Sequence, residues 1–358
     1  MSETVLVTGG TGFVAGWCIR ALLERGHVVR TTLRDTSKEA AVRAAVGRGN
    51  PRAPLERLQF AVADLSHDNG WDAAVTGCDY VMHVASPLGG GDPRDRHSLV
   101  APARDGTLRV LRAAARANVK RVVMTSAAAT ARPPLSSGVT SDESIWADPD
   151  DPQFDAYRVS KILAERAAWD FVKDPSGATQ LTTILPGAVF GPILSASNLG
   201  SVQIIQGLLA GRPPAMPKLG FWIVDVRDLA DLHVRAMTAG AAAGQRYIAS
   251  SEFLWMDEIA ATLRAQLGPA AARVPTRRLP TALVKLLLPF LANLRPLAPL
   301  LGRRFEQTSA KAREELGFAP RSATATLVDC ARSLASPDSA DCAAPRIADD
   351  SRTDEVRP

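Results

Sequence analysis

The chain alternates short runs of apolar, β-branched residues with longer stretches of helical periodicity. The short runs predict buried strands at 4–8, 28–34, 58–63, 80–84, 121–125, 181–185 and 246–249. The longer stretches predict helices at 14–25, 103–117, 157–171, 256–267 and 323–334. Strands separated by helices of this length are typical of βαβ units. The order therefore predicts an α/β fold built on a doubly wound parallel Rossmann sheet.

The texture of the sequence changes at Gly187. Beyond this point the chain is rich in glycine, proline and serine, which favours long loops over another regular βαβ unit. We expect a dinucleotide-binding domain at 1–186, with 220–250 returning to it, and a smaller C-terminal α/β substrate lobe at 187–335. Residues 336–358 have no periodicity and are rich in Asp, Ser, Pro and Ala, so we expect a disordered tail.

Composition excludes several classes of protein. Of the 358 residues, 46% are hydrophobic and 22% charged, which is ordinary for a globular protein and unlike a disordered chain or a disulfide scaffold. The net charge is +5, but no basic run is present, so a nucleic-acid partner has little support. The four cysteines and five histidines are dispersed, which predicts reduced thiols and no metal site.

The most apolar stretch, 279–301, contains Lys285, Arg295 and four prolines. A membrane span needs about 20 uninterrupted apolar residues, so we expect no span here. This stretch is expected to cover a substrate pocket or to form the face of a homodimer, and contact with a membrane surface is the less favoured alternative. The first predicted strand begins almost at the N-terminus and leaves no room for a signal peptide, so we expect a cytoplasmic protein.

The strongest local signal is the glycine-rich segment 7–16, VTGGTGFVAG, between the first predicted strand and the first predicted helix. Gly10, Gly12 and Ala15 satisfy the G-x-G-x-x-G/A pattern, and Gly9 precedes them. A Cβ atom would block the tight turn and the approach of a pyrophosphate, while the helix N-terminus offers free N–H groups and a partial positive charge. The segment predicts a dinucleotide site; a plain strand-to-helix turn is the alternative.

The end of the second predicted strand indicates which dinucleotide binds. NAD enzymes usually place an acidic residue there for the ribose 2′-hydroxyl. Here Arg34 comes first and Lys38 follows, so a 2′-phosphate can meet a guanidinium and an ammonium, which favours NADP(H). Asp35 could instead bind a free ribose. After the third predicted strand, Asp64 and Leu65 can frame the adenine, although Asp64 also suits a helix N-cap.

Tyr157 and Lys161 stand four residues apart near the start of a predicted helix, so they share one face. A free phenol has a pKa of about 10, and an adjacent ammonium lowers it. We therefore expect Lys161 to lower the pKa of Tyr157 and to make it an acid/base group near neutral pH. The same lysine can bind a nicotinamide ribose. Y-x-x-x-K also occurs by chance in helices, but here it follows a Rossmann half.

Together these segments resemble the extended short-chain dehydrogenases/reductases, and within them the dihydroflavonol-4-reductase-like group of NADP-dependent carbonyl reductases. The matching segments run in the family's order from residue 5 to about 335: VTGGTGFVAG, TTLRD, ADL, HVASP, GTLRVLRAA, KRVVMTS, YRVSK, ILPGAVFGP, VDVRDLADLH and KAREELGF. The set is highly specific for the superfamily, less so for the subgroup and least for the substrate.

The resemblance implies cofactor-binding residues at the carboxyl ends of strands and at the start of the first helix. They are Gly9, Gly12, Phe13 and Val14 at the pyrophosphate or ribose, Arg34 with Lys38 nearby at the 2′-phosphate, Asp64 and Leu65 at the adenine, Val84, Ala85, Ser86 and Thr125 beside the cofactor, and Pro186, Gly187 and Val189 over the nicotinamide. The resemblance also makes Tyr157 the catalytic acid/base and Lys161 its helper, with the hydride supplied by NADPH.

One position departs from the family's pattern. The family has Thr-Ser-Ser at the end of the fifth strand, where the second serine binds the substrate oxygen, but here that serine is Ala127. An alanine cannot donate a hydrogen bond to the developing alkoxide. Ser126 is retained as a catalytic candidate, although strand alternation aims it at the opposite face unless the strand bends. Thr130, Ser86 or a bound water are other substitutes, and a subgroup that needs no serine is the simplest explanation.

These expectations describe an NADP(H)-dependent oxidoreductase that reduces a small-molecule ketone or aldehyde. The 5% aromatic content and the Leu-, Pro- and Ala-rich lobe suggest a bulky, hydrophobic substrate. A hydroxysteroid-type dehydrogenase and a sugar-nucleotide epimerase are the enzymatic alternatives. A weakly active NADP-binding regulatory protein is the alternative from another class, motivated by Ala127.

Overall fold

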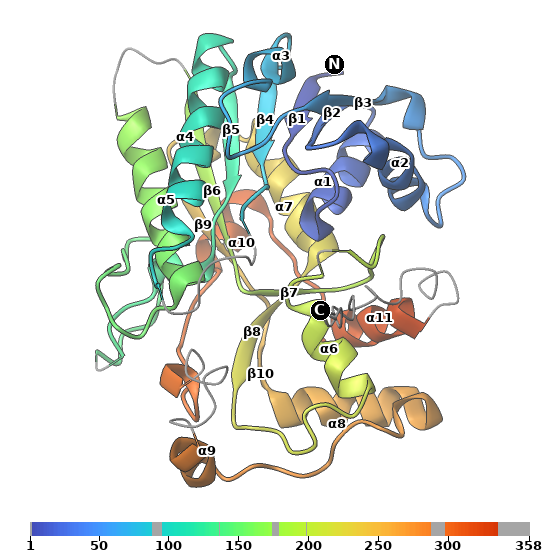
Figure 1. The fold of residues 1–358 in the computed structure, drawn as a ribbon, viewed down its shortest axis with the longest axis vertical. Helices are drawn as coiled ribbons and strands as arrows, with labels where there is room; N and C mark the ends of the chain where they lie inside the picture. The colour runs from blue at the N-terminus through green and yellow to red at the C-terminus, as the bar shows by residue number, and fades with distance from the viewer. Residues whose placement is uncertain are drawn as a thin grey trace, which may run out of the picture.

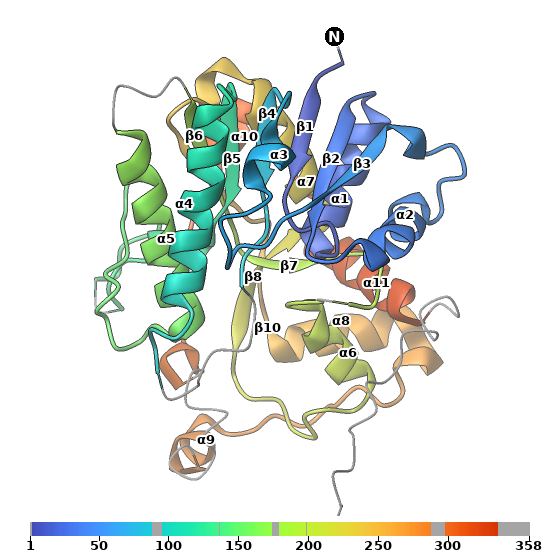
Figure 2. The same ribbon diagram turned by 45° about the horizontal axis from the view of Figure 1, so that its top comes forward.

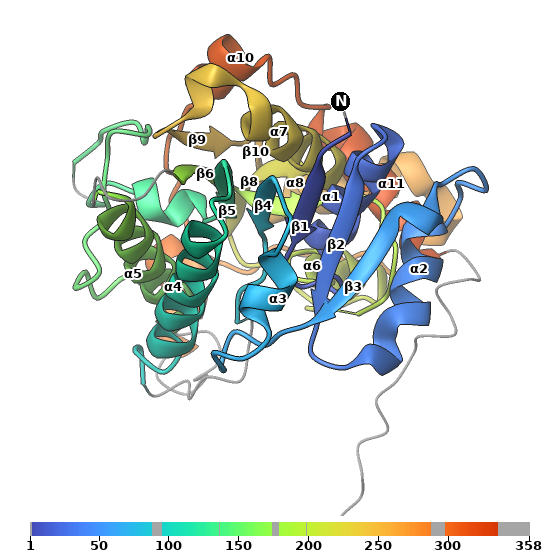
Figure 3. The ribbon, with the colours of Figure 1, turned by 90° about the horizontal axis from the view of Figure 1, so that it is seen from above.

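A computed structural model describes residues 2–87, 95–135, 137–173, 179–197, 199–287 and 298–335. Its main layer is a seven-stranded sheet in the order β3-β2-β1-β4-β5-β6-β9 (Figures 1 and 3). The strands are β1 (Thr4–Val7), β2 (Val28–Leu33), β3 (Leu58–Val62), β4 (Tyr80–His83), β5 (Arg121–Thr125), β6 (Gln180–Pro186) and β9 (Arg246–Ala249). All neighbours are parallel, which confirms the predicted doubly wound sheet. The order reverses between β1 and β4, where such sheets bind ligands beyond the carboxyl ends of their strands.

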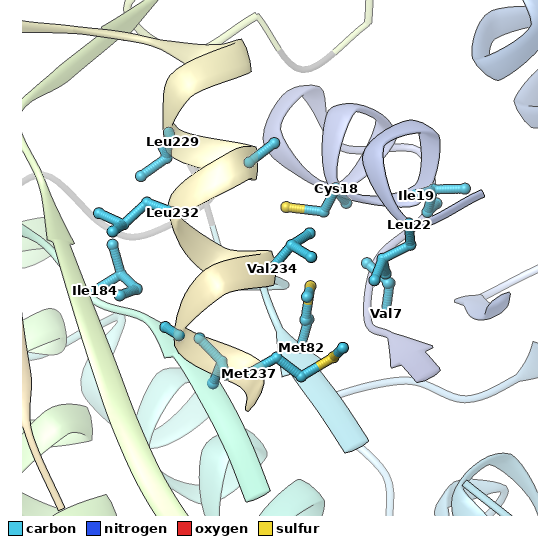
Figure 4. Close-up of a cluster of buried hydrophobic side chains, with 14 of the residues drawn as sticks. Val7, Cys18, Ile19, Leu22, Met82, Ile184, Leu229, Leu232, Val234 and Met237 are labelled. Carbon is cyan, nitrogen blue, oxygen red and sulfur yellow. The ribbon is translucent and has the colours of Figure 1, made fainter. Parts of the chain in front are cut away.

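Helices cover both faces of this sheet (Figure 3). One face carries α3 (Trp71–Val75), α4 (Val100–Arg116) and α5 (Ala156–Val172), and the other carries α1 (Phe13–Glu24), α2 (Glu39–Gly47), α7 (Val226–Thr238) and α10 (Ala310–Leu316). Figure 4 shows apolar side chains of α1 meeting those of α7 above β4 and β6. Cys18, Ile19 and Leu22 on α1 are fully buried, as are Leu229 and Leu232 on α7. Burying one such aliphatic side chain contributes about 1.5–3 kcal/mol, which fixes α1 and its N-terminal loop on the sheet.

A smaller sheet has the order β10-β8-β7 and lies below the large one (Figures 1 and 2). Its strands are β7 (Ala188–Phe190), β8 (Gly220–Asp225) and β10 (Phe253–Trp255), and it packs with α6 (Val202–Leu209), α8 (Met256–Leu267) and α11 (Ala323–Ala335). Because β7 and β8 are parallel with α6 between them, the expectation that no further βαβ unit follows Gly187 is wrong. A strand of three residues carries no readable periodicity, and the Gly- and Pro-rich connections dominate the composition.

The chain passes between the two layers several times. β8 lies in the small sheet, whereas the following helix α7 packs on the large sheet. β9 is then the edge strand of the large sheet. The proposed domain boundaries therefore remain a prediction. The expected tail at 336–358 lies outside the described residues, as does part of the stretch 279–301, whose described portion includes α9 (Thr281–Leu287). Within the described ranges, no helix is long and apolar enough to cross a membrane.

Candidate functional site

The glycine turn between β1 and α1 is crowded on its inner side. Gly9 has φ +77°, and a Cβ on it would lie 2.9 Å from the Cβ of Ala85. A Cβ on Gly10 would lie 2.6 Å from Oγ1 of Thr31. Gly12 is the N-cap of α1, no side chain caps this helix, and no acidic residue stands in its first turn. The first-turn N–H groups, including those of Phe13 and Val14, therefore face outward for an anion, and the cradle fits a dinucleotide pyrophosphate.

A neutral histidine holds this turn against β4. The Oγ1 atom of Thr8 accepts the backbone N–H groups of 84–85 at 3.0 and 2.9 Å, so its own O–H donates to Nδ1 of His83 at 3.1 Å. Nε2 of His83 then carries the proton and donates to Thr107 at 3.2 Å. Burial lowers the pKa of His83 to about 3, and the charge of Lys161 adds to this effect. His83 is therefore a structural residue that connects the turn to the surroundings of Lys161.

The rim of the site at the end of β2 carries exposed charges. Arg34 and Lys38 are both exposed. Asp35, the alternative ribose ligand, caps the next turn: its carboxylate accepts the N–H of Ser37 at 2.9 Å and the hydroxyl of Ser37 at 2.5 Å. These hydrogen bonds hold the pKa of Asp35 below its usual value. The carboxylate that would favour NAD is thus engaged locally, while the two cations remain open to solvent.

Asp64 and Leu65 follow β3 at the same edge of the sheet. Oδ1 of Asp64 accepts the N–H and the hydroxyl of Ser66 at 2.9 and 2.7 Å, which makes a turn rather than a helix N-cap and leaves Oδ2 for a ligand. The hydrogen bond from the Ser66 N–H is the main reason that the pKa of Asp64 is lowered, with the charge of Arg34 contributing. Leu65 packs against α4 at Gly106, because a Cβ added to Gly106 would lie 2.8 Å from the Cβ of Leu65.

The residues expected over the nicotinamide lie where β6 ends and β7 begins. Pro186 is buried at the end of β6, and the N–H of Gly187 donates to the carbonyl of Ala249 at 3.0 Å. A Cβ on Gly187 would lie 2.3 Å from the carbonyl oxygen of Trp222, so only glycine fits there. Val189 is half-buried on β7. Their contact with a cofactor stays a prediction.

Tyr157 and Lys161 meet the end of β5 from the first turns of α5. Nζ of Lys161 is buried and donates to the backbone carbonyl of Thr125 at 3.1 Å. It lies 6.0 Å from the centroid of the Tyr157 ring. The Tyr157 side chain is half-buried, and its hydroxyl has no hydrogen-bond partner among the described residues. The hydroxyl of Thr125 instead pairs with Nε2 of His233 at 2.7 Å, so this side chain turns towards α7 rather than a cofactor.

The two pKa shifts correct one expectation. Burial raises the pKa of Tyr157, so the prediction that Lys161 lowers it is wrong. The physical reason is that the ammonium is aimed at the Thr125 carbonyl, while the phenol loses solvent. Burial also lowers the pKa of Lys161 to about 8, and the carboxylate of Glu165 opposes that effect. At neutral pH the tyrosine is a neutral phenol, the form that can donate a proton.

A buried polar network lies behind Lys161, and its centre is Glu165, a residue that was not predicted from the sequence. This carboxylate accepts hydrogen bonds from Ser126 at 2.6 Å, Thr183 at 2.7 Å and Nε of Arg246 at 2.9 Å. Burial alone would raise the pKa of Glu165, but the Arg246 guanidinium and these hydrogen bonds hold it below its usual value. The available signal was the spacing: Glu165 follows Lys161 by four residues and so shares its helix face.

This network changes the role of Ser126. Its side chain is 2% exposed, and its hydroxyl donates to Glu165, so it does not reach a substrate oxygen. The expectation that Ser126 is catalytic is therefore not supported, because strand alternation does turn it away from Ala127. Thr130 is also engaged: its hydroxyl donates to the carbonyl of Ala127 at 2.9 Å and accepts from Arg246 at 3.2 Å. Ser86 is half-buried, and its hydroxyl has no partner within the described part of the chain.

Two surface hollows lie away from all these groups. One, of about 410 Å³, is bordered by Leu23, Glu24, Gly26, Asn50, Arg52, Pro54, Glu56 and Arg57. The other, of about 340 Å³, is bordered by Trp169, Val172, Lys173, Thr179, Gln180, Leu181 and Gly244. Neither contains a predicted site residue.

Residues 5–249 match the NAD dependent epimerase/dehydratase family. Cinnamoyl-CoA reductase CAD2 of Medicago truncatula is 36% identical over 254 residues, which are 68% of this chain and 75% of that protein. Dihydroflavonol 4-reductase of Zea mays is 34% identical over 272 residues, 73% of each chain. The crystal structure of Gre2 from Candida albicans in complex with NADPH superimposes with a TM-score of 0.77 at 26% identity, covering 93% of this chain and 98% of that one. These matches confirm the resemblance drawn from the sequence.

Proposed function

Because the chain belongs to the NAD dependent epimerase/dehydratase family, we propose that it is an NADPH-dependent reductase that converts a ketone or aldehyde to an alcohol. One observation carries the proposal. His83 is hydrogen bonded to Thr8 in the glycine turn, and the charge of Lys161 lowers its pKa. Lys161 in turn donates to the Thr125 carbonyl at the end of β5, the strand that pairs with β4. These contacts support a single site at the carboxyl ends of β1, β4 and β5 that contains both the predicted cofactor cradle and the Tyr157–Lys161 pair.

The rim of the cradle supports NADPH as the cofactor. Arg34 and Lys38 are exposed where a 2′-phosphate would lie, and Asp35 is occupied by Ser37. A guanidinium matches the geometry of a phosphate, and its hydrogen bonds to an anion are the strong kind. When bound, NADPH supplies the hydride.

The chain's own residues supply position and a proton. Tyr157, held as a neutral phenol by burial, donates its proton to the carbonyl oxygen of the substrate. Lys161, fixed by the Thr125 carbonyl, stabilises the phenolate that this transfer leaves. Glu165 favours the charged form of Lys161, and Ser126 helps to hold Glu165 in place. Ser126 is thus a positioning residue in this proposal.

The substrate oxygen has one donor fewer than in relatives with Thr-Ser-Ser. Ala127 is buried and offers no hydroxyl, and Thr130 is engaged elsewhere. We infer that Tyr157 is the main hydrogen-bond donor to the carbonyl oxygen. Of the hydroxyls considered as substitutes, that of Ser86 has no partner within the described residues. Loss of one oxyanion donor costs about 10²–10³ in kcat in well-studied hydrolases, so a modest turnover is expected.

The experiment follows NADPH oxidation with a panel of ketones and aldehydes in wild type and Tyr157→Phe. We expect the substitution to lower kcat by about 10²–10⁴-fold, because it removes the proton donor and leaves the ring. Tyr80→Phe is the matched control, since Tyr80 stacks against Lys120 at the other end of β4. Equal rates in wild type and Tyr157→Phe would refute the reductase. Tightly held NAD with conversion of a nucleotide sugar, and no NADPH oxidation, would instead identify an epimerase.

A further inference from the structure

Arg132 lies close to the candidate site, between the end of β5 and the start of α5. It directly follows the 3-10 helix Ala128–Ala131 that continues β5 beyond Ala127. Its guanidinium lies 4.6 Å from the ring centroid of Phe305 and 5.9 Å from that of Phe154. Two aromatic rings thus hold the cation in a narrow range of positions.

This guanidinium makes no hydrogen bond or ion pair with any described residue. The side chain is half-buried, and none of its nitrogen atoms is among the fully enclosed, unpaired atoms of the described ranges. The nearest carboxylates are already engaged. Asp155 caps α5 and pairs with Arg158, and Asp151 accepts the backbone and side-chain N–H groups of Gln153.

Burial therefore disfavours the charged form of the Arg132 guanidinium, and no hydrogen bond or ion pair with a described residue offsets this effect. It lowers the pKa of Arg132 to about 9, the charge of Arg158 adds to the effect, and Asp155 and Asp151 oppose it. Arg132 remains charged at neutral pH. A half-buried guanidinium with five N–H donors and no acceptor is unusual in a folded protein, because buried polar groups are normally paired. An acceptor from a ligand would relieve this cost.

The surroundings of Arg132 connect it to both sides of the site. The carbonyl of Phe305 accepts Nε1–H of Trp222 at 2.5 Å, and the carbonyl of Trp222 lies against Gly187, in the segment expected over the nicotinamide. On the other side, the Arg132 guanidinium lies 5.9 Å from the ring of Phe154, which precedes Tyr157 by three residues just before α5 begins. Arg132 is therefore placed between the catalytic tyrosine and the small sheet.

We propose that Arg132 binds an anionic oxygen group of the substrate, so that this chain reduces a carbonyl compound that carries a carboxylate or a phosphate. This inference rests on the proposed function and refines its substrate class. The planar guanidinium offers two parallel N–H donors to such a group, and the flanking rings suit an apolar body next to it. The substrate is then amphiphilic rather than uniformly hydrophobic.

The first test compares matched substrates that differ only in the anion. Phenylglyoxylate is paired with its ethyl ester, and dihydroxyacetone phosphate with dihydroxyacetone, so that the arms separate carboxylate from phosphate. In the preferred arm, wild type should favour the anion by about tenfold or more in kcat/KM. Arg132→Gln should lower kcat/KM for the anion by about 10- to 100-fold and for its neutral partner by less than about threefold.

Arg132→Lys and Arg304→Gln serve as controls. Arg132→Lys keeps the positive charge but removes the two parallel N–H donors of the guanidinium, so it should retain part of the preference for the anion. Arg304 is a neighbouring guanidinium that pairs with Glu306 and stacks on Phe253, so Arg304→Gln should leave the preference unchanged. If Arg132→Gln slows both members of a pair equally, or if wild type prefers the neutral members, the anion site is refuted.

A binding measurement separates this inference from the reductase itself. Calorimetric titration of wild type and Arg132→Gln with phenylglyoxylate and with dihydroxyacetone phosphate, each with NADP⁺ present, requires no turnover. Affinity for either anion that depends on Arg132, with no reduction of any carbonyl, would keep the anion site and refute the reductase. Reduction of neutral ketones with equal anion affinity in both proteins would do the reverse. Thermal unfolding of each variant checks that it folds.

Discussion

The two sides of the proposed site, a cofactor side and a catalytic side, are held together by different kinds of interaction. The cofactor side consists of the glycine turn, Thr8 and His83, whose contacts are neutral and mostly involve backbone groups. The catalytic side consists of Lys161, Glu165 and Arg246, three buried ionisable side chains that depend on one another. The first side is set by the local shape of the chain. The second side is set by charges brought together from distant positions.

This difference predicts different sensitivities. A neutral, backbone-made turn tolerates changes of pH and of distant residues, because no charge in it needs a partner. A buried charged group is costly once its partner is removed, since the remaining charge is left without solvent. Each experiment below acts on one of the two sides and asks whether the other side responds.

The largest effect is expected from Glu165→Gln, which breaks the charged side. Removing the carboxylate leaves Arg246 buried without a counter-ion, and such losses cost about 3–5 kcal/mol in the free energy of unfolding. Urea denaturation measures this change. Asp170→Asn is the control on the same helix, because Asp170 pairs with Lys173 in an exposed bridge worth at most about 1 kcal/mol. Equal destabilisation by the two substitutions would show that the buried Glu165–Arg246 pair contributes no more to the free energy of unfolding than the exposed Asp170–Lys173 pair.

The pH dependence of turnover should sharpen the contrast. Lys161 has a pKa of about 8, so its ammonium is present below that pH and is lost as the pH rises through it. Tyr157 has a raised pKa and stays protonated. The rate of reduction should therefore fall towards a limit of about tenfold per pH unit above pH 8, as expected when one protonated group is required. Steady-state kcat between about pH 7 and 9 measures this fall.

The control for this profile is Lys161→Arg, whose guanidinium does not lose its proton in that range. It should turn over more slowly but without the falling limb. The affinity for NADPH should stay nearly constant over the same range, because His83 and His233, with pKa values of about 3 and 4, are already neutral. A wild-type rate that is flat up to about pH 9 would contradict a role for the Lys161 ammonium.

The smallest effect is expected at the rim of the cofactor side. Arg34→Ala should weaken the binding of NADPH by about tenfold and that of NADH by less than about twofold, since only NADPH carries the 2′-phosphate. Fluorescence titration of the reduced cofactors measures both affinities. Arg52→Ala, another exposed arginine, should change neither. An equal loss for both cofactors would mean that Arg34 does not recognise the phosphate.

Much of the cofactor side could be predicted from the sequence, because its signals are local. The segment VTGGTGFVAG contains the turn, the helix start and the glycines within ten consecutive residues. The seven strands of the large sheet were likewise readable as buried apolar runs. The pair Tyr157 and Lys161 was predicted for the same reason, since residues four positions apart lie on the same face of a helix.

The rest of the site depends on separations that local patterns do not contain. Ser126 and Glu165 are 39 residues apart, and Glu165 and Arg246 are 81 residues apart. No period in the sequence connects them, so Ser126 was assigned to the substrate although its partner is Glu165. The prediction that Lys161 lowers the pKa of Tyr157 was wrong for a related reason. Spacing indicates which groups are near each other, but the largest effect on this pKa is burial, which follows from the whole fold.

Arg246 connects the edge of the large sheet to the buried network behind Lys161. This residue belongs to β9, the outermost strand, yet its guanidinium contacts the same carboxylate that keeps the amine of Lys161 charged. A substitution of Arg246 would therefore change the electrostatic surroundings of Lys161 as well as the packing of the sheet edge. Engineers who wish to graft a new edge onto this scaffold must carry the arginine over, or replace both members of the couple together.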